Sequence, residues 1–187
     1  KLEPADVFAA IEAPGFSDVR AVCFASVFAY PLLMPALAEI FRRIKEKGPI
    51  LLADMTKRKN GETLKDIAPA LQYADYVFPN LDEAYLLTGT RDASAIARRF
   101  LACGVRNAVV KLGAEGCLVK NAGVEAIVPA VPGIQAVDTT GAGDNFAAGF
   151  IDALLRGESL IDCARWGNAV ASLCVEQVGA TSGTREH

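Results

Sequence analysis

A run of small residues ending in an acid is the part of the sequence best suited to chemistry: Gly141, Ala142, Gly143 and Asp144. It stands at the start of a segment with helical period, in which Phe146, Phe150 and Leu154 recur every four positions. Small residues at a helix N-terminus let a ligand approach the backbone, and the unpaired N–H groups and the helix dipole there favour an anion. The run therefore predicts a phosphate-binding site at the start of this helix.

Asp144 has two interpretations that the residue types leave open. It complements the helix dipole, as acids of a first helical turn commonly do, or it acts as a base beside the phosphate. The glycines match neither of two familiar phosphate-binding motifs. No Lys-Ser/Thr pair follows at P-loop spacing, and Phe146 stands where the dinucleotide fingerprint needs its third glycine. Neither a Walker-type kinase nor a Rossmann dehydrogenase is supported.

Composition and charge narrow the classes of function. The 187 residues are 52% hydrophobic, which is enough apolar material for one sizeable core. Lys and Arg number 19 against 22 Asp and Glu, a net charge of -3, so we expect no nucleic-acid partner. The stretch from Ala21 to Ala38 is uncharged, but Pro31 and Pro35 interrupt it, so we expect no membrane-spanning helix.

Histidine and cysteine usage excludes further classes. The single histidine is the last residue, His187, which argues against Ser-His or Cys-His nucleophiles and against histidine-ligated metals. The cysteines are odd in number, widely spaced and without a Cys-x-x-Cys pair. We therefore expect reduced, mostly buried thiols in a cytoplasmic protein.

Short apolar runs alternate with longer segments of helical period, which is typical of parallel strands covered by helices. We expect an α/β fold with a doubly wound, mostly parallel sheet and helices on both faces, in a single domain over residues 1–187. The expected strands are 19–25, 50–53, 76–78, 107–111, 116–120 and 125–129, and the expected helices are 35–47, 63–70, 81–87, 93–103, 145–156 and 161–177. Ligands bind such sheets beyond the carboxyl ends of the strands, where we expect Asp54, Asn80, Lys111 and Asp138.

The segment Asp138–Phe150 reads Asp-Thr-Thr-Gly-Ala-Gly-Asp-Asn-Phe-Ala-Ala-Gly-Phe and resembles the C-terminal signature of the PfkB (ribokinase-like) family of carbohydrate and nucleoside kinases. Asn80-Leu-Asp-Glu83, with Leu-Thr-Gly after it, is similar to the family's Asn-x-x-Glu motif. The segment 111–116 resembles the family's turn beside the nucleotide phosphates, and 165–180 its last helix and loop. The resemblance covers nearly the whole chain.

The resemblance implies transfer of the terminal phosphoryl group of ATP, with Mg²⁺, to a hydroxyl group of a sugar or related small molecule. Asp144 would be the general base, and the amides of Gly141, Ala142 and Gly143 would form the anion hole. The other implied residues contact nucleotide or metal: Lys111, Gly113 and Gly116 along the phosphates, Asn168 near the adenine, and Asn80 and Glu83 around magnesium and its waters. Asp138 and Thr140 match positions that build a potassium site in members activated by a monovalent cation.

Simpler structural roles remain open for several of these residues. Asn80 and Glu83 also form an ordinary N-cap with a capping-box glutamate, and both roles can hold at once. Gly113 and Gly116 also suit a tight turn, and Asn168 a surface position on a helix.

The sequence departs from the family pattern at two places. After Asp54 the usual continuation toward Asn and Arg is replaced by Met-Thr-Lys-Arg. The family's N-terminal part, with its Gly-Gly substrate motif and the small β-sheet lid, has no counterpart here. We therefore expect the C-terminal part of a longer kinase, with a homodimer through the lid missing here. A nucleoside kinase and an inactive nucleotide-binding regulatory protein are the alternatives.

Overall fold

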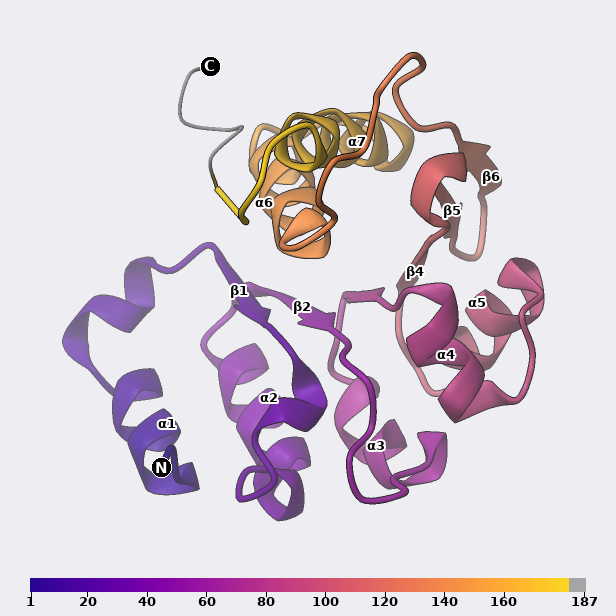
Figure 1. Cartoon of the computed structure of the whole chain (residues 1–187). Helices are drawn as coiled ribbons and strands as arrows, with labels where there is room; N and C mark the ends of the chain where they lie inside the picture. Colours follow the sequence, from indigo (N-terminus) through magenta and orange to yellow (C-terminus); the bar gives the residue numbers. More distant parts are fainter. Residues whose placement is uncertain (182–187) are drawn as a thin grey trace. The chain divides into compact units, whose positions relative to one another are not determined.

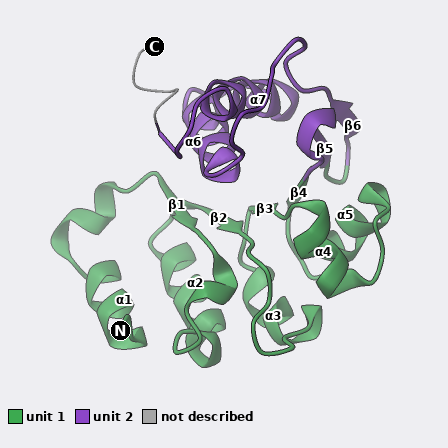
Figure 2. Ribbon diagram, viewed as in Figure 1, with its two compact units in different colours: residues 1–110, 120–122 green, residues 111–119, 123–187 purple. Residues whose placement is uncertain are grey.

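The computed structural model describes residues 1–181, which form two compact units (Figures 1 and 2). Unit 1 comprises residues 1–110 and 120–122. Unit 2 comprises residues 111–119 and the described residues from Gly123 onward. The single domain expected from the sequence stays a prediction, and His187 lies outside the described residues.

Unit 1 is built on a row of parallel strands. These are β1 (Ala21–Phe24), β2 (Ile50–Asp54), β3 (Tyr76–Phe78) and β4 (Asn107–Lys111). Each pairs in parallel with the next, with Ala21 opposite Ile50, Leu52 opposite Tyr76, and Tyr76 opposite Asn107. The middle of β2 and of β4 is fully buried, as expected for parallel strands with covered faces. All four strands lie where the sequence predicts them, within two residues.

Five α-helices accompany these strands, one before β1 and the others between successive strands. They are α1 (Pro4–Ile11), α2 (Leu37–Glu46), α3 (Leu64–Leu71), α4 (Leu81–Thr88) and α5 (Ala93–Ala102), with short 3₁₀ turns at Pro14–Asp18, Val27–Ala29 and Met34–Ala36. Helix α2 buries Leu37, Ile40, Phe41 and Ile44 on one face. Helix α1 is not among the helices expected from the sequence, and its eight residues bury only Ile11.

A buried carboxylate ties the amino ends of the strands together. Asp75 is 7% exposed and stands directly before β3. Its Oδ2 accepts hydrogen bonds from Lys45 Nζ at 2.6 Å and from Leu51 N at 2.9 Å, and its Oδ1 lies 3.2 Å from an Arg106 guanidinium nitrogen. Removing one partner of such a group leaves a desolvated charge, so the cluster holds α2, β2 and β3 in register. It lies at the end of the strands opposite to their carboxyl ends.

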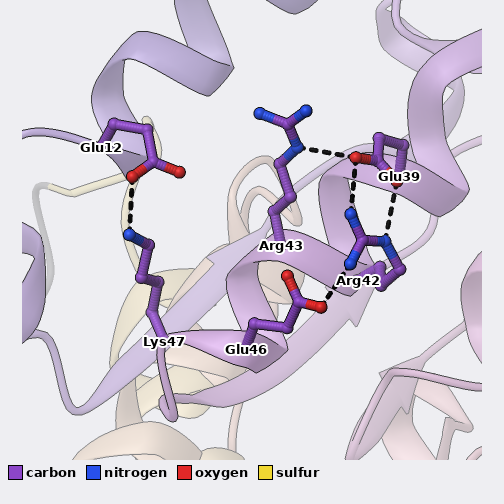
Figure 3. A network of polar contacts seen from close by, with 6 residues as sticks. All are labelled: Glu12, Glu39, Arg42, Arg43, Glu46 and Lys47. Atoms are coloured by element: carbon purple, nitrogen blue, oxygen red, sulfur yellow. Dashed lines mark hydrogen bonds and ion pairs between the residues drawn. The ribbon is translucent and has the colours of Figure 1, made fainter.

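The solvent face of α2 carries an ion-pair network (Figure 3). Glu39 accepts hydrogen bonds from Arg42 at 2.8 Å and from Arg43 at 2.7 Å, and Arg42 also pairs with Glu46. The hydrogen bonds from the two guanidinium groups lower the pKa of the Glu39 carboxyl to about 2. Because these groups are exposed, the network contributes little to stability.

Unit 2 combines a pair of short strands with two long helices. Strands β5 (Cys117–Lys120) and β6 (Glu125–Val128) are neighbours, and the 3₁₀ turn Gly113–Glu115 precedes β5. Helices α6 (Ala142–Leu155) and α7 (Leu160–Val175) pack closely, because a Cβ atom added at Gly149 would lie 2.7 Å from Trp166 O. Gly167 likewise leaves room for the ring of Phe146.

The element boundaries in unit 2 follow the sequence predictions except at the start of α6. This helix begins at Ala142, three residues before the expected start, so Asp144 lies inside its first turn. None of the helices in the described part of the chain is both long enough and apolar enough to cross a membrane.

Candidate active site

The start of α6 presents unpaired amide donors. Gly141 is its N-cap residue and adopts φ +79°, and no side chain caps the helix. The Ala142 amide donates to Thr139 O at 3.2 Å. Within residues 1–181, no acceptor is found for the next two amides, those of Gly143 and Asp144. These donors and the helix dipole favour a negatively charged ligand.

A lysine adds a full positive charge at this helix start. Lys111 ends β4, and a Cβ atom added at Gly143 would lie 3.1 Å from Lys111 Nζ. Glycine therefore leaves the space that the ammonium group occupies. The positive end of a helix dipole and an ammonium group repel each other unless an anion lies between them. The pair is suited to a phosphate group.

The carboxylate of Asp144 projects from the same turn. Its residue is exposed, and no hydrogen-bond or ion-pair partner is found for it within the described residues. Its position in the first turn suits both interpretations left open by the sequence, the dipole-complementing acid and the base.

A pocket of about 310 Å³ adjoins the helix start, in the size range of small-molecule sites. Thr139 and Ala142 line the end nearest to α6. Most other lining residues are small or apolar and come from the 113–114 turn, the 130–136 connection and one face of α7: Gly113, Ala114, Ala130, Val131, Ile134, Ala136, Asn168, Ala171, Ser172 and Val175. A largely apolar group of small-molecule size fits such a lining.

Two of the predicted site residues contact the backbone that leads into one wall of this pocket. Asn168 is 7% exposed, and its side-chain amide donates to Val128 O at 3.1 Å and to Pro129 O at 3.0 Å. A Cβ atom at Gly116 would lie 2.1 Å from Val128 O, and the φ there is +93°, so only glycine fits. Gly116 and Asn168 thus fix the start of the 130–136 connection, and Asn168 and Gly113 also line the pocket itself.

Asp138 organises the segment before α6. Its Oδ1 accepts a hydrogen bond from Thr140 N at 2.9 Å and its Oδ2 one from Gly179 N at 3.0 Å. These backbone donors lower the pKa of the Asp138 carboxyl below its usual value. The carboxylate therefore holds its own loop and the 179–180 segment, both in unit 2.

The remaining predicted residues lie in unit 1. Asn80 caps α4: its Oδ1 accepts from Glu83 N at 2.9 Å, and Glu83 Oε2 accepts from Asn80 N at 2.9 Å. The capping box expected as the simpler role is therefore formed. Asp54 ends β2, is 5% exposed and accepts from Met55 N. Across residues 1–181, no group of three His, Cys, Asp or Glu side chains is placed to hold a metal ion.

Unit 2 thus contains the helix start, Lys111, Gly113 and Asn168, and their roles at a nucleotide stay predictions. Sequence reasoning missed Asn145 and Cys174, whose side chains contact the backbone of the Gly141 segment. The signal for Asn145 was its place directly after Asp144, but its bonding partners are 4 and 35 residues away. Only the fold shows the second contact.

Comparison with known proteins gives a consistent assignment. The pfkB family carbohydrate kinase profile matches residues 5–187. The chain is 39% identical over 120 residues to an uncharacterized sugar kinase of Archaeoglobus fulgidus, covering 64% of this chain and 47% of that protein. It is 38% identical over 126 residues to the 2-dehydro-3-deoxygluconokinase of Bacillus subtilis, covering 66% of this chain and 38% of that protein. The chain spans less than half the length of these relatives.

Solved structures show the same fold. The Arabidopsis thaliana ribokinase in complex with ribose and ATP matches 97% of this chain and 56% of its own, with a TM-score of 0.73 and 26% identity. The aminoimidazole riboside kinase of Salmonella enterica, in complex with aminoimidazole riboside and an ATP analogue, matches 88% of this chain and 59% of its own, with a TM-score of 0.76 and 27% identity. The expected ribokinase-like α/β fold is therefore confirmed.

The Gly141 position gives a direct test of the helix-start geometry. A Cβ atom there would lie 2.5 Å from Ala180 Cβ, whereas Gly113 has a similar positive φ but open space around it. We expect Gly113→Ala to cost about 1 to 2 kcal/mol, the left-handed penalty alone. Gly141→Ala should cost a further amount of about 1 to 3 kcal/mol for overpacking. Urea denaturation of both variants measures the difference, and equal losses would contradict the close contact with Ala180.

Proposed function

Because the chain belongs to the pfkB family of carbohydrate kinases, we propose that it transfers the terminal phosphoryl group of ATP to a hydroxyl group of a sugar or related small molecule. One observation carries the proposal: a pocket of about 310 Å³ opens beside a helix start that combines two unpaired amides with a lysine ammonium group. An apolar pocket next to a concentrated positive charge suits a nucleotide, in which a nucleobase is joined to phosphates. The ATP complex of the ribokinase relative supports the nucleotide.

We propose that the adenine and the phosphates of ATP bind at different places, the adenine in the pocket and the phosphates at the start of α6. We place the adenine in the pocket, against Ala171 and Val175 of α7 and the 130–136 connection. The Asn168 amide donors are engaged with Val128 O and Pro129 O, so Asn168 shapes the pocket rather than reading the base through those donors. Thr139 and Ala142 border the pocket on the α6 side, so the phosphates extend toward the helix start.

The transferred phosphoryl group would lie at the α6 N-terminus. The resemblance to the family implies an anion hole formed by the amides of residues 141–143. The Ala142 amide is engaged with Thr139 O, so we assign the main part to the amides of Gly143 and Asp144 with Lys111 Nζ. Preorganised donors of this kind stabilise charge that develops on the phosphoryl oxygens without reorganising during the reaction.

Asp144 is the proposed general base. It would accept the proton of the acceptor hydroxyl, and its exposed carboxylate on the first turn of α6 lies next to the amides that hold the phosphoryl group. Since the transition state of phosphoryl transfer is loose, much of the benefit comes from orienting the hydroxyl group. An intact Asp144 also favours an active enzyme over a nucleotide-binding regulatory protein.

Magnesium is the metal expected at the phosphates, where it neutralises charge. Asn80 and Glu83 offer an amide and a carboxylate oxygen, the hard donors that Mg²⁺ prefers, but the only side-chain oxygen of Asn80 and one of the two of Glu83 accept hydrogen bonds in the capping box. From the resemblance to the family, we propose that both hold magnesium through bound waters, which Mg²⁺ retains readily.

The acceptor is proposed only as a class. The relatives include a 2-dehydro-3-deoxygluconokinase and a ribokinase, which favour a sugar or sugar acid as the acceptor. The similarity to an aminoimidazole riboside kinase makes a nucleoside the second candidate. Phosphorylation assays with ribose, 2-dehydro-3-deoxygluconate and aminoimidazole riboside distinguish these classes. A cytoplasmic location and a dimer formed through a lid stay predictions.

A monovalent cation beside Asp138 and Thr140 is a further part of the proposal. The carbonyl oxygen of Thr140 lies 3.4 Å from the Cys174 sulfur and keeps a second lone pair for a cation, whereas Ala180 O already accepts from Cys174 and Asn145. The Asp138 carboxylate contacts the backbone of both segments. Carbonyl and carboxylate oxygens are suitable ligands for potassium.

Replacement of Asp144 separates its two interpretations. We expect Asp144→Ala in the complete protein to lower turnover by at least about 10², the usual contribution of a positioned base. ATP affinity should stay similar or improve, because a negative charge beside the phosphates is removed. Asp144→Asn should retain more activity, and Asp152→Ala on the same helix is the matched control. Turnover close to wild type with saturating substrates would contradict the mechanism.

The cation proposal is tested by salt substitution. We expect the complete protein to turn over faster in potassium chloride than in sodium or lithium chloride at equal ionic strength. Steady-state rates with saturating ATP and acceptor measure the effect. Equal rates in the three salts would remove Asp138 and Thr140 from the cation site.

A further inference from the structure

The side chain of Asn145 bridges two backbone segments that are far apart in the sequence. Its Nδ2 atom donates to Gly141 O at 2.9 Å and to Ala180 O at 2.7 Å. Gly141 and Ala180 are also in direct contact, since a Cβ atom on Gly141 would lie 2.5 Å from Ala180 Cβ. The amide therefore holds the N-cap of α6 and the 179–180 segment together.

The thiol of Cys174 spans the same two segments from the end of α7. It is buried, and it lies 3.4 Å from Thr140 O and 3.3 Å from Ala180 O. Burial, with the charges of Asp138 and Asp144, raises the pKa of the Cys174 thiol, so it keeps its proton and can donate at neutral pH. Ala180 O thus receives donors from α6 and from α7.

We propose that Asn145 and Cys174 are positioning residues for phosphoryl transfer, which clamp the 179–180 segment against Thr140 and Gly141. This inference rests on the proposed function. Both side chains bond to carbonyl groups and neither lines the pocket, so they act on the backbone and not on the nucleotide. They fix the direction of the backbone that leads into the Gly143 and Asp144 amides, and displacements of about 1 Å in such a site cost about 10²-fold in rate.

The two clamp residues have different consequences when replaced. Asn145→Asp keeps the shape but places carboxylate oxygens, which only accept, against two carbonyl oxygens. It should therefore be at least as harmful as Asn145→Leu, which removes the donors. Cys174→Ala removes one donor, whereas Cys174→Ser restores a hydroxyl donor. Cys163→Ala is the matched control, because Cys163 is a buried thiol on α7 that lies 3.6 Å from Glu158 O, outside the clamp.

The test combines kinetics with amide hydrogen exchange on the complete protein. We expect Asn145→Leu and Asn145→Asp to lower kcat by about 10- to 100-fold, with the KM for MgATP within about threefold of wild type. Exchange in residues 138–145 should accelerate by at least about 10-fold. Cys174→Ala should give smaller changes of the same kind, Cys174→Ser should recover most of the activity, and Cys163→Ala should leave both measurements unchanged.

The possible contrary results bear separately on the clamp, on the positioning role and on the proposed function. Unchanged exchange in both Asn145 variants contradicts the clamp, whatever the activity. Faster exchange with unchanged kcat contradicts the positioning role. If the wild-type protein phosphorylates none of the three acceptors while exchange responds as expected, the clamp is supported and the proposed function fails.

Discussion

The left-handed backbone at Gly141 is the constraint on which the candidate site depends. With φ +79°, it turns the chain sharply into α6, so that the next amides point outward instead of into a preceding helical turn. The same residue has no Cβ atom, which lets Ala180 approach it closely. One glycine thus sets both the direction of the donors and the contact that supports them.

The charges around this turn have complementary roles. Lys111 and the helix dipole make the site positive. Both carboxylate oxygens of Asp138 accept hydrogen bonds from backbone amides. The negative charge of Asp138 therefore orders the loop before α6. Within unit 1, Asp75 pairs with Lys45 and Arg106 and orders the amino ends of the strands in the same way. The buried carboxylate of Asp75 is thus structural. Its position before β3 fits this role, because ligands bind beyond the carboxyl ends of parallel strands.

Sequence patterns predicted the local parts of this structure well. Glycine before an apolar helical period located α6, and Asn80 with Glu83 predicted the capping box that forms. The start of α6 was placed three residues late, because the glycines that open the ligand site are poor helix formers. Contacts such as Asn145 with Ala180 and Lys111 with Gly143 join residues 35 and 32 positions apart. Local periodicity contains no information about these pairs.

We propose that the pocket and the α6 start hold one nucleotide. A crystal structure of the complete protein with Mg²⁺ and a non-hydrolysable ATP analogue would show where the nucleotide binds. We expect the adenine in the pocket beside Ala171 and Val175, with the terminal phosphate bonded to the Gly143 and Asp144 amides and to Lys111 Nζ. A nucleotide bound elsewhere, or phosphates turned away from α6, would contradict this proposal.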